Sequence, residues 1–584
     1  MSAILRNFLV IALLLSPLSI RAEQSKLSDI LDEKLEPIAN TALDYVFYGP
    51  DIAGGKIRFY KPGESGEMML PIVLVLLAGT AIFLTFYFRF INLRGFGIAL
   101  RTAKGKYTDP KAPGEITHFQ ALSAALSATV GLGNIGGVAV AVGIGGPGAT
   151  FWMIVMGLCG MTTKFAECTL GVKYRKLTPD GRVKGGAMYY LRDGLKERGL
   201  GPLGAILAIF FALFVIGGAF GAGNMFQSNQ AFSQFNTTFL GGAEATNGAK
   251  LTFGAILAIL VGLVIIGGIV RIAKVTAFLV PFMCGIYVLT ALIILLTNIG
   301  DVIPAFGTII SSAFSNDAVA GGLIGVLIQG VRRAAFSNEA GLGSAPIAHS
   351  AVKTDKPASE GFVALLEPFV DTVVVCTMTA LVIVITGAWQ VSGEVTGDGV
   401  SMITAPGSSE VVRELDGGQF VHTRSSKDGL TEVIGLVSSE SRVAESVSGW
   451  IPSDSIADRK GVPMTSMAFG SVIQWFPILL TIAVILFAFS TMISWSYYGE
   501  QGVIYLFSFL GDDKVKIPIL IYKILFCALV VVGASASLTN VLNLSDAMIF
   551  AMVVPNLIGL YFLLPVIKKE TKSYLDHVKT TDAS

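Results

Sequence analysis

Leu126-Ser-Ala-Thr-Val-Gly-Leu-Gly-Asn134 and Phe336-Ser-Asn-Glu-Ala-Gly-Leu-Gly-Ser344 are the two stretches that decide the fold. Both follow the pattern Ser-x-x-x-Gly-Leu-Gly and then a small polar residue, and each lies in the middle of a long apolar segment. A glycine costs a helix about 1 kcal/mol relative to alanine, so two glycines in three residues favour a break. Unwound backbone is tolerated in a bilayer only where it lines a cavity or binds something. The motifs therefore predict two interrupted membrane helices.

The composition supports a membrane location. Of the 584 residues, 53% are hydrophobic and only 14% are charged, against roughly 25% charged in soluble domains. A soluble fold of this length could not cover its surface with so few charges, whereas a lipid-facing surface needs none. The net charge of +1, without a basic patch carrying interleaved aromatic residues, gives no indication of a nucleic-acid partner.

The apolar segments predict an all-α polytopic membrane protein. A spanning helix needs about 20 mostly apolar residues. Eleven stretches meet this requirement, at 69–93, 117–145, 147–172, 203–232, 251–272, 274–298, 318–351, 360–388, 467–496, 516–537 and 543–567.

The polar segments divide the chain further. Residues 1–22 resemble a secretory signal peptide, with Arg6 before a short apolar run and Ala22 at its end; an uncleaved anchor is the alternative. The predicted order is then an extracytoplasmic segment at 23–68, a transmembrane core with helices 1–8 at 69–388, an extracytoplasmic insertion with short strands at 389–466, helices 9–11 at 467–568, and a cytoplasmic tail at 569–584.

Lys and Arg concentrate in alternate loops. Loops 94–116 and 173–202 are rich in them, whereas 233–250 and 299–317, expected outside, share only Lys250. Positive charge is retained on the cytoplasmic side. We therefore expect a multi-pass protein of the bacterial inner membrane, with its N-terminus outside after signal cleavage and its C-terminus in the cytoplasm.

The two motifs lie at corresponding places of an internal repeat. Each opens a set of five spans, and because five is odd, the second set must be inverted relative to the first. Gly-interrupted helices at matching positions of two inverted halves indicate a transporter site at the bilayer midplane. Freed N–H groups at a half-helix suit a carboxylate, and freed carbonyls suit a hard cation. An amino acid and Na⁺ supply both, although close helix packing through small residues without a break is an alternative.

Ionisable residues inside spans are candidates for function or for buried pairing. Glu339 paired with either neighbouring arginine is one interpretation, and a gating role is the other. Lys164 and Glu167 lie near the end of a span, where snorkelling to the interface is expected. The residues predicted as gating or structural charges are Arg332, Arg333, Glu339 and Asp371.

Four segments carry a resemblance to a known family. Residues 117–167, Phe336 to His349, Asp371-Thr372 and 494–500 closely resemble the sodium:alanine/glycine symporter family. The similarity covers nearly everything from about 70 to 568. It implies one leading helix plus a five-plus-five inverted repeat with broken first helices, and uptake of alanine or glycine driven by Na⁺ rather than an enzymatic reaction.

The resemblance also implies a site. The first break meets the substrate carboxylate, Gln227 approaches from the fourth helix, and Phe336 forms an apolar lid. The implied substrate-binding residues are Thr129, Gly131, Gly133, Asn134, Gln227, Phe336, Ser337, Asn338 and Gly341. By analogy with the related fold, the implied Na⁺ ligands are Ser127, Val130, Ser490 and Thr491.

Alternatives remain open at this point. The same fold could couple to H⁺ through Asp371 or Glu339, or serve as a non-concentrating channel or a sensor. The small residues around the breaks indicate a pocket that excludes bulky amino acids. The sequence does not decide among alanine, glycine and serine, and it does not give the oligomeric state.

Overall fold

The structure of the protein is a computed structural model. It describes residues 26–583 except 52–57, 60–68, 110, 180, 241–244, 316–321, 392, 396–397, 417–418, 428–429, 438–442, 446, 453–454, 459–460 and 512. The predicted signal peptide at 1–22 lies outside the described residues.

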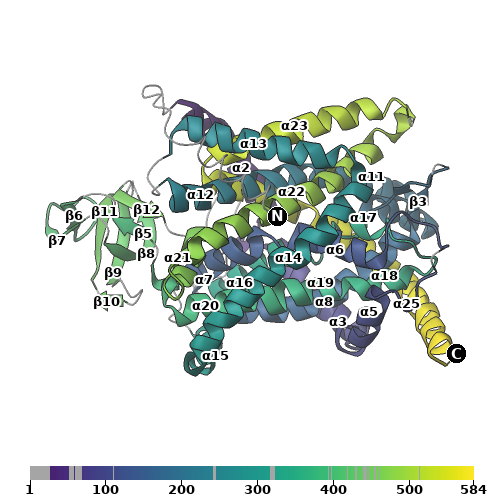
Figure 1. Ribbon diagram of the computed structural model, residues 1–584, viewed down its shortest axis with the longest axis horizontal. Helices are drawn as coiled ribbons and strands as arrows, with labels where there is room; N and C mark the ends of the chain where they lie inside the picture. Colours follow the sequence, from purple (N-terminus) through teal and green to yellow (C-terminus); the bar gives the residue numbers. More distant parts are fainter. Residues whose placement is uncertain are drawn as a thin grey trace.

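Helices form the body of the molecule (Figure 1). The first half contains α2 (Lys26–Val46), α3 (Ile72–Tyr87), α4 (Ile91–Arg94), α5 (Phe96–Ala103), α6 (His118–Thr129), η2 (Gly133–Gly137), α7 (Val138–Gly145), α8 (Ala149–Lys173), α9 (Ala187–Tyr189), η3 (Tyr190–Gly194), α10 (Leu195–Glu197), α11 (Gly201–Phe220), η4 (Gly221–Met225), α12 (Phe226–Phe239), α13 (Asn247–Ile265), α14 (Gly268–Thr297) and α15 (Ile299–Ala313). The second half contains α16 (Gly322–Asn338), α17 (Pro346–His349), α18 (Pro357–Ala364), α19 (Leu366–Pro368), η5 (Phe369–Cys376), α20 (Thr377–Ile385), η6 (Ala388–Gln390), α21 (Val462–Gly470), α22 (Phe476–Leu506), η8 (Ser508–Leu510), α23 (Lys516–Ser535), α24 (Leu538–Ala551) and α25 (Val553–Ala583).

The structure confirms the prediction that the protein is mostly helical and has several helices able to cross a membrane. Within the described residues, eight helices are long and apolar enough to cross a membrane, or nine if the bent pair α6 and η2–α7 forms one span. The predicted spans 69–93 and 318–351 contain α3 and α16, which have only 16 and 17 residues. The count of eleven and the inverted relation of the halves therefore stay predictions.

Both predicted helix breaks are present. Helix α6 ends at Thr129, and the segment that resumes at Gly133 is bent by 49° from it. Helix α16 ends at Asn338, and α17 begins only at Pro346. The intervening backbone enters the left-handed region at Gly341 and Gly343, a conformation that glycine adopts without a steric penalty.

The segment expected as an outside loop at 299–317 contains a helix instead. Helix α15 carries Ala305 and Ile309, which are buried in a small apolar cluster with Leu381. The apolar side chains on one face of this segment favour a packed helix over a solvated loop.

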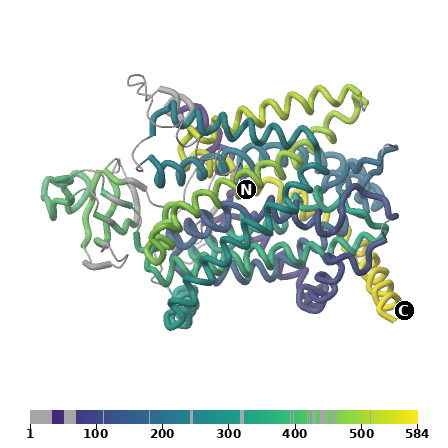
Figure 2. The backbone as a smooth tube through the Cα atoms, viewed as in Figure 1, coloured from purple at the N-terminus to yellow at the C-terminus, as the bar shows by residue number. Residues whose placement is uncertain are grey.

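The insertion at 389–466 forms strands, as predicted. An eight-stranded antiparallel sheet has the order β12-β5-β8-β9-β11-β6-β7, with β10 paired to β9. Figures 1 and 2 place this sheet at one end of the helical bundle and the C-terminus at the other. The strands are β5 (Gly393–Val395), β6 (Val400–Ile403), β7 (Val411–Leu415), β8 (Phe420–Lys427), β9 (Leu430–Val437), β10 (Val443–Glu445), β11 (Gly449–Pro452) and β12 (Ile456–Asp458); two short pairs elsewhere are β1 (Pro50–Asp51) with β2 (Arg58–Phe59), and β3 (Lys176–Leu177) with β4 (Val183–Lys184).

Helices α11, η4 and α12 form one long run that packs against α22. At their contact a Cβ on Gly223 would lie 2.3 Å from Cβ and 2.4 Å from Cγ of Trp495. These atoms lie next to the α22 backbone and cannot swing aside. Gly223 is therefore required for the close approach of the two helices.

We predict that Gly223→Ala destabilises the protein by about 1–3 kcal/mol, because an added methyl group overpacks the helix contact. Gly79→Ala is the matched control, since a Cβ at Gly79 on α3 has no atom within 4 Å. The midpoint of thermal unfolding in detergent measures both variants. A midpoint for Gly223→Ala equal to that of Gly79→Ala would contradict the packing described.

Candidate functional site

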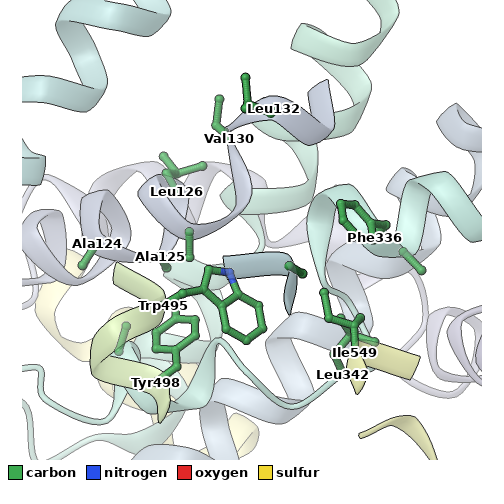
Figure 3. Packing of buried hydrophobic residues seen from close by; sticks show 14 of the residues in the cluster. Ala124, Ala125, Leu126, Val130, Leu132, Phe336, Leu342, Trp495, Tyr498 and Ile549 are labelled. Atoms are coloured by element: carbon green, nitrogen blue, oxygen red, sulfur yellow. The ribbon is translucent and has the colours of Figure 1, made fainter. Parts of the chain in front are cut away.

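A small buried cavity lies between the two helix breaks. Its volume is about 10 Å³, roughly the space of one water molecule. Figure 3 shows the indole of Trp495 beneath the turn that carries Val130 and Leu132, with Phe336 and Ile549 across from it. The lining residues are Ala128, Thr129, Gly131, Gly133, Ala222, Gln227, Phe336, Glu339, Trp495 and Ile549.

Five predicted substrate-binding residues line this cavity. They come from three separate parts of the chain, namely α6 with its break, α12 and α16. Sequence reasoning missed Ala222, Trp495 and Ile549, because no local pattern distinguishes them from ordinary residues of apolar helices. The five residues that the structure brings together around this cavity are Thr129, Gly131, Gly133, Gln227 and Phe336.

Gln227 provides a polar atom without a partner. Its Nε2 donates to the carbonyl of Ala222 at 2.9 Å, and its buried Oε1 has no hydrogen-bond partner among the described residues. A buried acceptor left unpaired costs about 1–3 kcal/mol. The cavity wall therefore contains an acceptor suited to a donor such as an ammonium group.

Glu339 begins the second break in a strained conformation. It is one of three non-glycine residues of the described chain with a positive φ, at 57°, and such strain persists where the surroundings enforce it. Its carboxylate accepts hydrogen bonds from Trp495 Nε1 at 3.0 Å and from the Ser344 hydroxyl. Glu339 thus belongs to the cavity wall, and the pairing with Arg332 or Arg333 considered above is wrong.

Both arginines contact Asp546 on α24 instead. Arg332 Nη2 and Arg333 Nη2 each lie 2.5 Å from Asp546 Oδ2. The Arg332 guanidinium also lies 4.4 Å from the centre of the Phe47 ring, which follows α2. Sequence reasoning overlooked Asp546, although an acid within the predicted span 543–567 was the signal that could have found it.

Asp371 organises a second polar cluster. Asn134 Nδ2 donates to Asp371 Oδ1 at 2.6 Å, and the hydroxyls of Ser337 and Thr372 donate to Oδ2 at 2.9 and 2.7 Å. Asn338 Nδ2 donates to Thr372 Oγ1 at 2.9 Å. Asn134, Ser337 and Asn338 therefore surround Asp371 and its neighbour and are not among the residues lining the cavity.

The second break is held by side chains from distant helices. The amide of Gly343 donates to Glu167 Oε1 at 3.0 Å, and Asn556 Nδ2 donates to the Gly341 carbonyl at 2.8 Å and to Glu167 Oε1 at 2.5 Å. Glu167 and Lys164 are fully buried. Their expected snorkelling is wrong, because N–H donors bond to Glu167 and the carboxylate of Glu367 pairs with Lys164, so protein groups replace water.

Three of the four residues predicted as Na⁺ ligands, Ser127, Ser490 and Thr491, meet where α6 packs against α22. Thr491 Oγ1 donates to the Ser127 carbonyl at 2.9 Å, and the Ser127 hydroxyl donates to the Ser490 carbonyl at 2.7 Å. Val130, the first residue after α6, is fully buried, and the Ser490 hydroxyl donates to the Phe487 carbonyl of its own helix at 3.0 Å. The contact brings together hydroxyl and carbonyl oxygens, the donor type that hard cations prefer.

Comparison with known families identifies the kind of protein. The model of the sodium:alanine symporter family matches residues 63–415 and 431–584. The chain belongs to this family. Members of the sodium:alanine symporter family are transporters and not enzymes, so cation-coupled amino-acid transport across a membrane is the general activity that membership supports.

Several curated relatives share most of their length with this sodium:alanine symporter family member. The sodium/alanine symporter AgcS of Methanococcus maripaludis is 40% identical over 86% of this chain and 94% of that protein. The probable sodium/glutamine symporter GlnT of Bacillus subtilis is 30% identical over 86% of this chain and 87% of that protein. Among solved structures, MhsT in complex with L-phenylalanine covers 78% of this chain and 99% of its own, at 13% identity and a TM-score of 0.46; that likeness is too weak to support an argument.

We predict that Asp546→Ala costs about 3–5 kcal/mol of unfolding free energy, because it leaves the Arg333 charge buried without its partner. Asp582→Ala is the control. Asp582 contacts Arg101 and Lys106 at the surface, and an exposed pair contributes little. Denaturant unfolding of the detergent-solubilised protein compares them, and equal stability of the two variants would rule out the buried ion pair.

Proposed function

We propose that this protein carries small neutral amino acids, above all alanine and glycine, into the cell together with Na⁺ by alternating access. The observation that carries the proposal is the cavity between two broken helices, whose wall holds the unpaired acceptor of Gln227. Family membership supports amino-acid transport in general, whereas the substrate and the coupling to Na⁺ belong to the proposal.

The cavity has the groups that an amino acid needs. An ammonium group would donate to Gln227 Oε1, and a carboxylate would lie at the N-terminal end of the helix that resumes at Gly133, where partial positive charge accumulates. Ala128 and Gly131 leave little space beside the wall, and Phe336 closes one side. This lining favours a side chain no larger than a methyl group or a hydroxymethyl group.

Asn134 connects the substrate to a candidate ion position. Its Oδ1 accepts from the Gly131 amide at 2.8 Å, and its Nδ2 donates to the carboxylate of Asp371. We assign one Na⁺ to the oxygens around Asp371, including those of Ser337 and Thr372. A cation there would withdraw Asn134 from Asp371 and change the first break, so the binding of ion and substrate would be energetically coupled.

A second Na⁺ position lies at the contact of α6 with α22. Its donors would be the carbonyls of Ser127 and Val130 and the hydroxyls of Ser490 and Thr491. Because the hydroxyl of Thr491 bonds directly to α6, a cation between them would hold the broken helix against α22 in one conformation. Loss of the cation would release this contact and allow the helices to separate.

The Arg332–Arg333–Asp546 group is proposed as the outer gate. It lies between α16 and α24, and Phe47, the residue after α2, covers the guanidinium of Arg332. Among the described residues, Arg333 Nε, Arg333 Nη1 and Asp546 Oδ1 are buried without a hydrogen-bond partner, so the pair costs less to open than a fully bonded one. In this proposal the protein lies in the bacterial inner membrane, with the eight-stranded sheet on the extracytoplasmic side and the C-terminus in the cytoplasm.

Uptake into proteoliposomes tests the function. We expect labelled alanine to accumulate above equilibrium with an inward Na⁺ gradient and not with an equal K⁺ gradient, and an excess of unlabelled leucine not to compete. Equilibration without accumulation would replace symport by a channel or uniporter. Dependence on a proton gradient at fixed Na⁺ would replace Na⁺ by H⁺, and efficient leucine uptake would refute the small pocket.

We predict that Thr491→Val raises the Na⁺ concentration for half-maximal uptake by about tenfold, because a lost oxygen ligand of a buried ion costs about 1–2 kcal/mol. Thr290→Val is the control, since within the described residues the hydroxyl of Thr290 donates only to the Ile286 carbonyl of its own helix. Alanine uptake is measured against Na⁺ at constant ionic strength. An unchanged Na⁺ dependence of Thr491→Val would remove this residue from the ion site.

A further inference from the structure

A chain of buried charged groups lies apart from the substrate cavity. Glu360 Oε2 contacts His118 Nδ1, and Glu360 Oε1 lies 2.6 Å from His349 Nδ1. The other ring nitrogen of His349 contacts Glu367 Oε1, and Glu367 Oε2 accepts from Lys164 Nζ at 3.1 Å. All five side chains are at most 2% exposed, and the proposed transport site uses none of them.

These five buried groups connect helices that adjoin both helix breaks. His118 is the first residue of α6, and Lys164 lies on α8. His349 ends α17, directly after the second break, while Glu360 and Glu367 lie on α18 and α19. Figure 1 places α17 and α18 toward the end of the bundle that carries the C-terminus, away from the sheet. The contacts among these five groups therefore hold both halves of the molecule together at that end.

The geometry at His349 determines a proton count. Each of its ring nitrogens faces a carboxylate oxygen. A neutral imidazole has one N–H donor and one acceptor nitrogen, so the acceptor nitrogen would meet a second acceptor unless one further proton is present. Because imidazole is a stronger base than a carboxylate, the further proton belongs on the ring. His349 is then an imidazolium that donates to both acids.

We propose that His349 is a proton-binding site, occupied when this end of the bundle is closed and emptied when it opens. The separation of α17 from α18 and α19 breaks the two contacts that require the proton. The N–H bond of the imidazolium then breaks and the proton passes to water at the opened end. The link to opening rests on the proposed function, whereas the proton count rests only on the contacts of His349.

The surrounding groups are consistent with this assignment. The bridging acids Glu360 and Glu367 outnumber Lys164, the cation that pairs with them, so a protonated His349 reduces the excess of buried negative charge. Cys168, His349 and Glu367 offer ligand atoms within 4.8 Å of one another, but His349 Nε2 and Glu367 Oε1 touch directly and leave no room for an ion between them, so we assign a proton to the bridge. The other titratable or charged groups that interact with its members from adjacent elements are Cys168, Glu167, Glu339, Arg175, Asp371, Tyr498 and Tyr574.

The sign of the pH effect follows from linkage. The closed conformation binds one proton more than the open one, so rising pH favours opening, by at most about tenfold per pH unit for a single proton. Polar chains of His and acidic residues inside a membrane protein commonly move protons. The proton of His349 leaves at the end of the bundle that carries the C-terminus, which faces the vesicle interior when the protein is inserted as in the cell. We therefore expect uptake to rise as the internal pH rises.

The proton itself is tested by nuclear magnetic resonance on protein labelled with ¹⁵N-histidine in detergent micelles. We expect one ring with both nitrogens protonated at pH 7.5, whose signal is absent from His349→Gln. A signal from His349 typical of a neutral tautomer at this pH would overturn the proposal. This measurement needs no transport, so its result is independent of the substrate and of Na⁺ coupling.

The coupling is tested with Glu360→Gln, whose amide can donate to a neutral His349 and so removes the need for the proton. Alanine uptake at fixed external pH and fixed Na⁺ gradient is measured at internal pH 6.5 and 8.5. We expect a several-fold rise for the unaltered protein and for the control His577→Gln, and no rise for Glu360→Gln. Equal pH dependence of all three would overturn the coupling. If the unaltered protein accumulates no alanine at either pH while the imidazolium signal is present, the proposed function fails and the proton site stands.

Discussion

Every interrupted helix in a bilayer needs partners for the peptide groups that it releases, and this requirement shapes the whole centre of the molecule. The first break is held by its own Asn134, which accepts from the Gly131 amide. The second is held by Glu167 of α8 and Asn556 of α25, which bond to Gly343 and Gly341. Because these partners are fixed by buried packing, the cavity between the breaks has defined walls.

The same side chains that satisfy the backbone also connect the parts that must move together. Asn134 serves the first break and the carboxylate of Asp371 at once, so a change at either reaches the other through one amide group. On one side of the cavity the two arginines and Asp546 join α16 to α24. On the other side His349 and its two acids join α17 to α18 and α19. Charge is thus buried where helices from different parts of the chain meet, and uncompensated charge there is costly.

Local spacing explains what the sequence could predict. The two Gly-Leu-Gly motifs placed both breaks correctly. Analogy with the related fold indicated a contact of Ser490 and Thr491 with α6, where Thr491 bonds through its hydroxyl and Ser490 through its carbonyl. Partners that are distant in sequence could not be found in this way. Asp546 and Asn556 follow no periodic pattern that links them to Arg333 or Gly341, and Trp495 looks like any apolar residue of a long helix. Their roles depend on how helices hundreds of residues apart pack, which a single sequence does not encode locally.

The difference between the two breaks has a consequence for synthesis. The partner of Gly131 lies 3 residues away, so the first break is complete as soon as it leaves the ribosome and enters the membrane. The Gly341 carbonyl waits for Asn556, which is 215 residues later, or roughly 10–40 s at ordinary translation rates of about 5–20 residues per second. Until Asn556 is synthesised, the Gly341 carbonyl must bond to water, or the insertion of the second broken helix into the membrane must be delayed. It is therefore the segment at which the insertion machinery or a chaperone would be needed for longest.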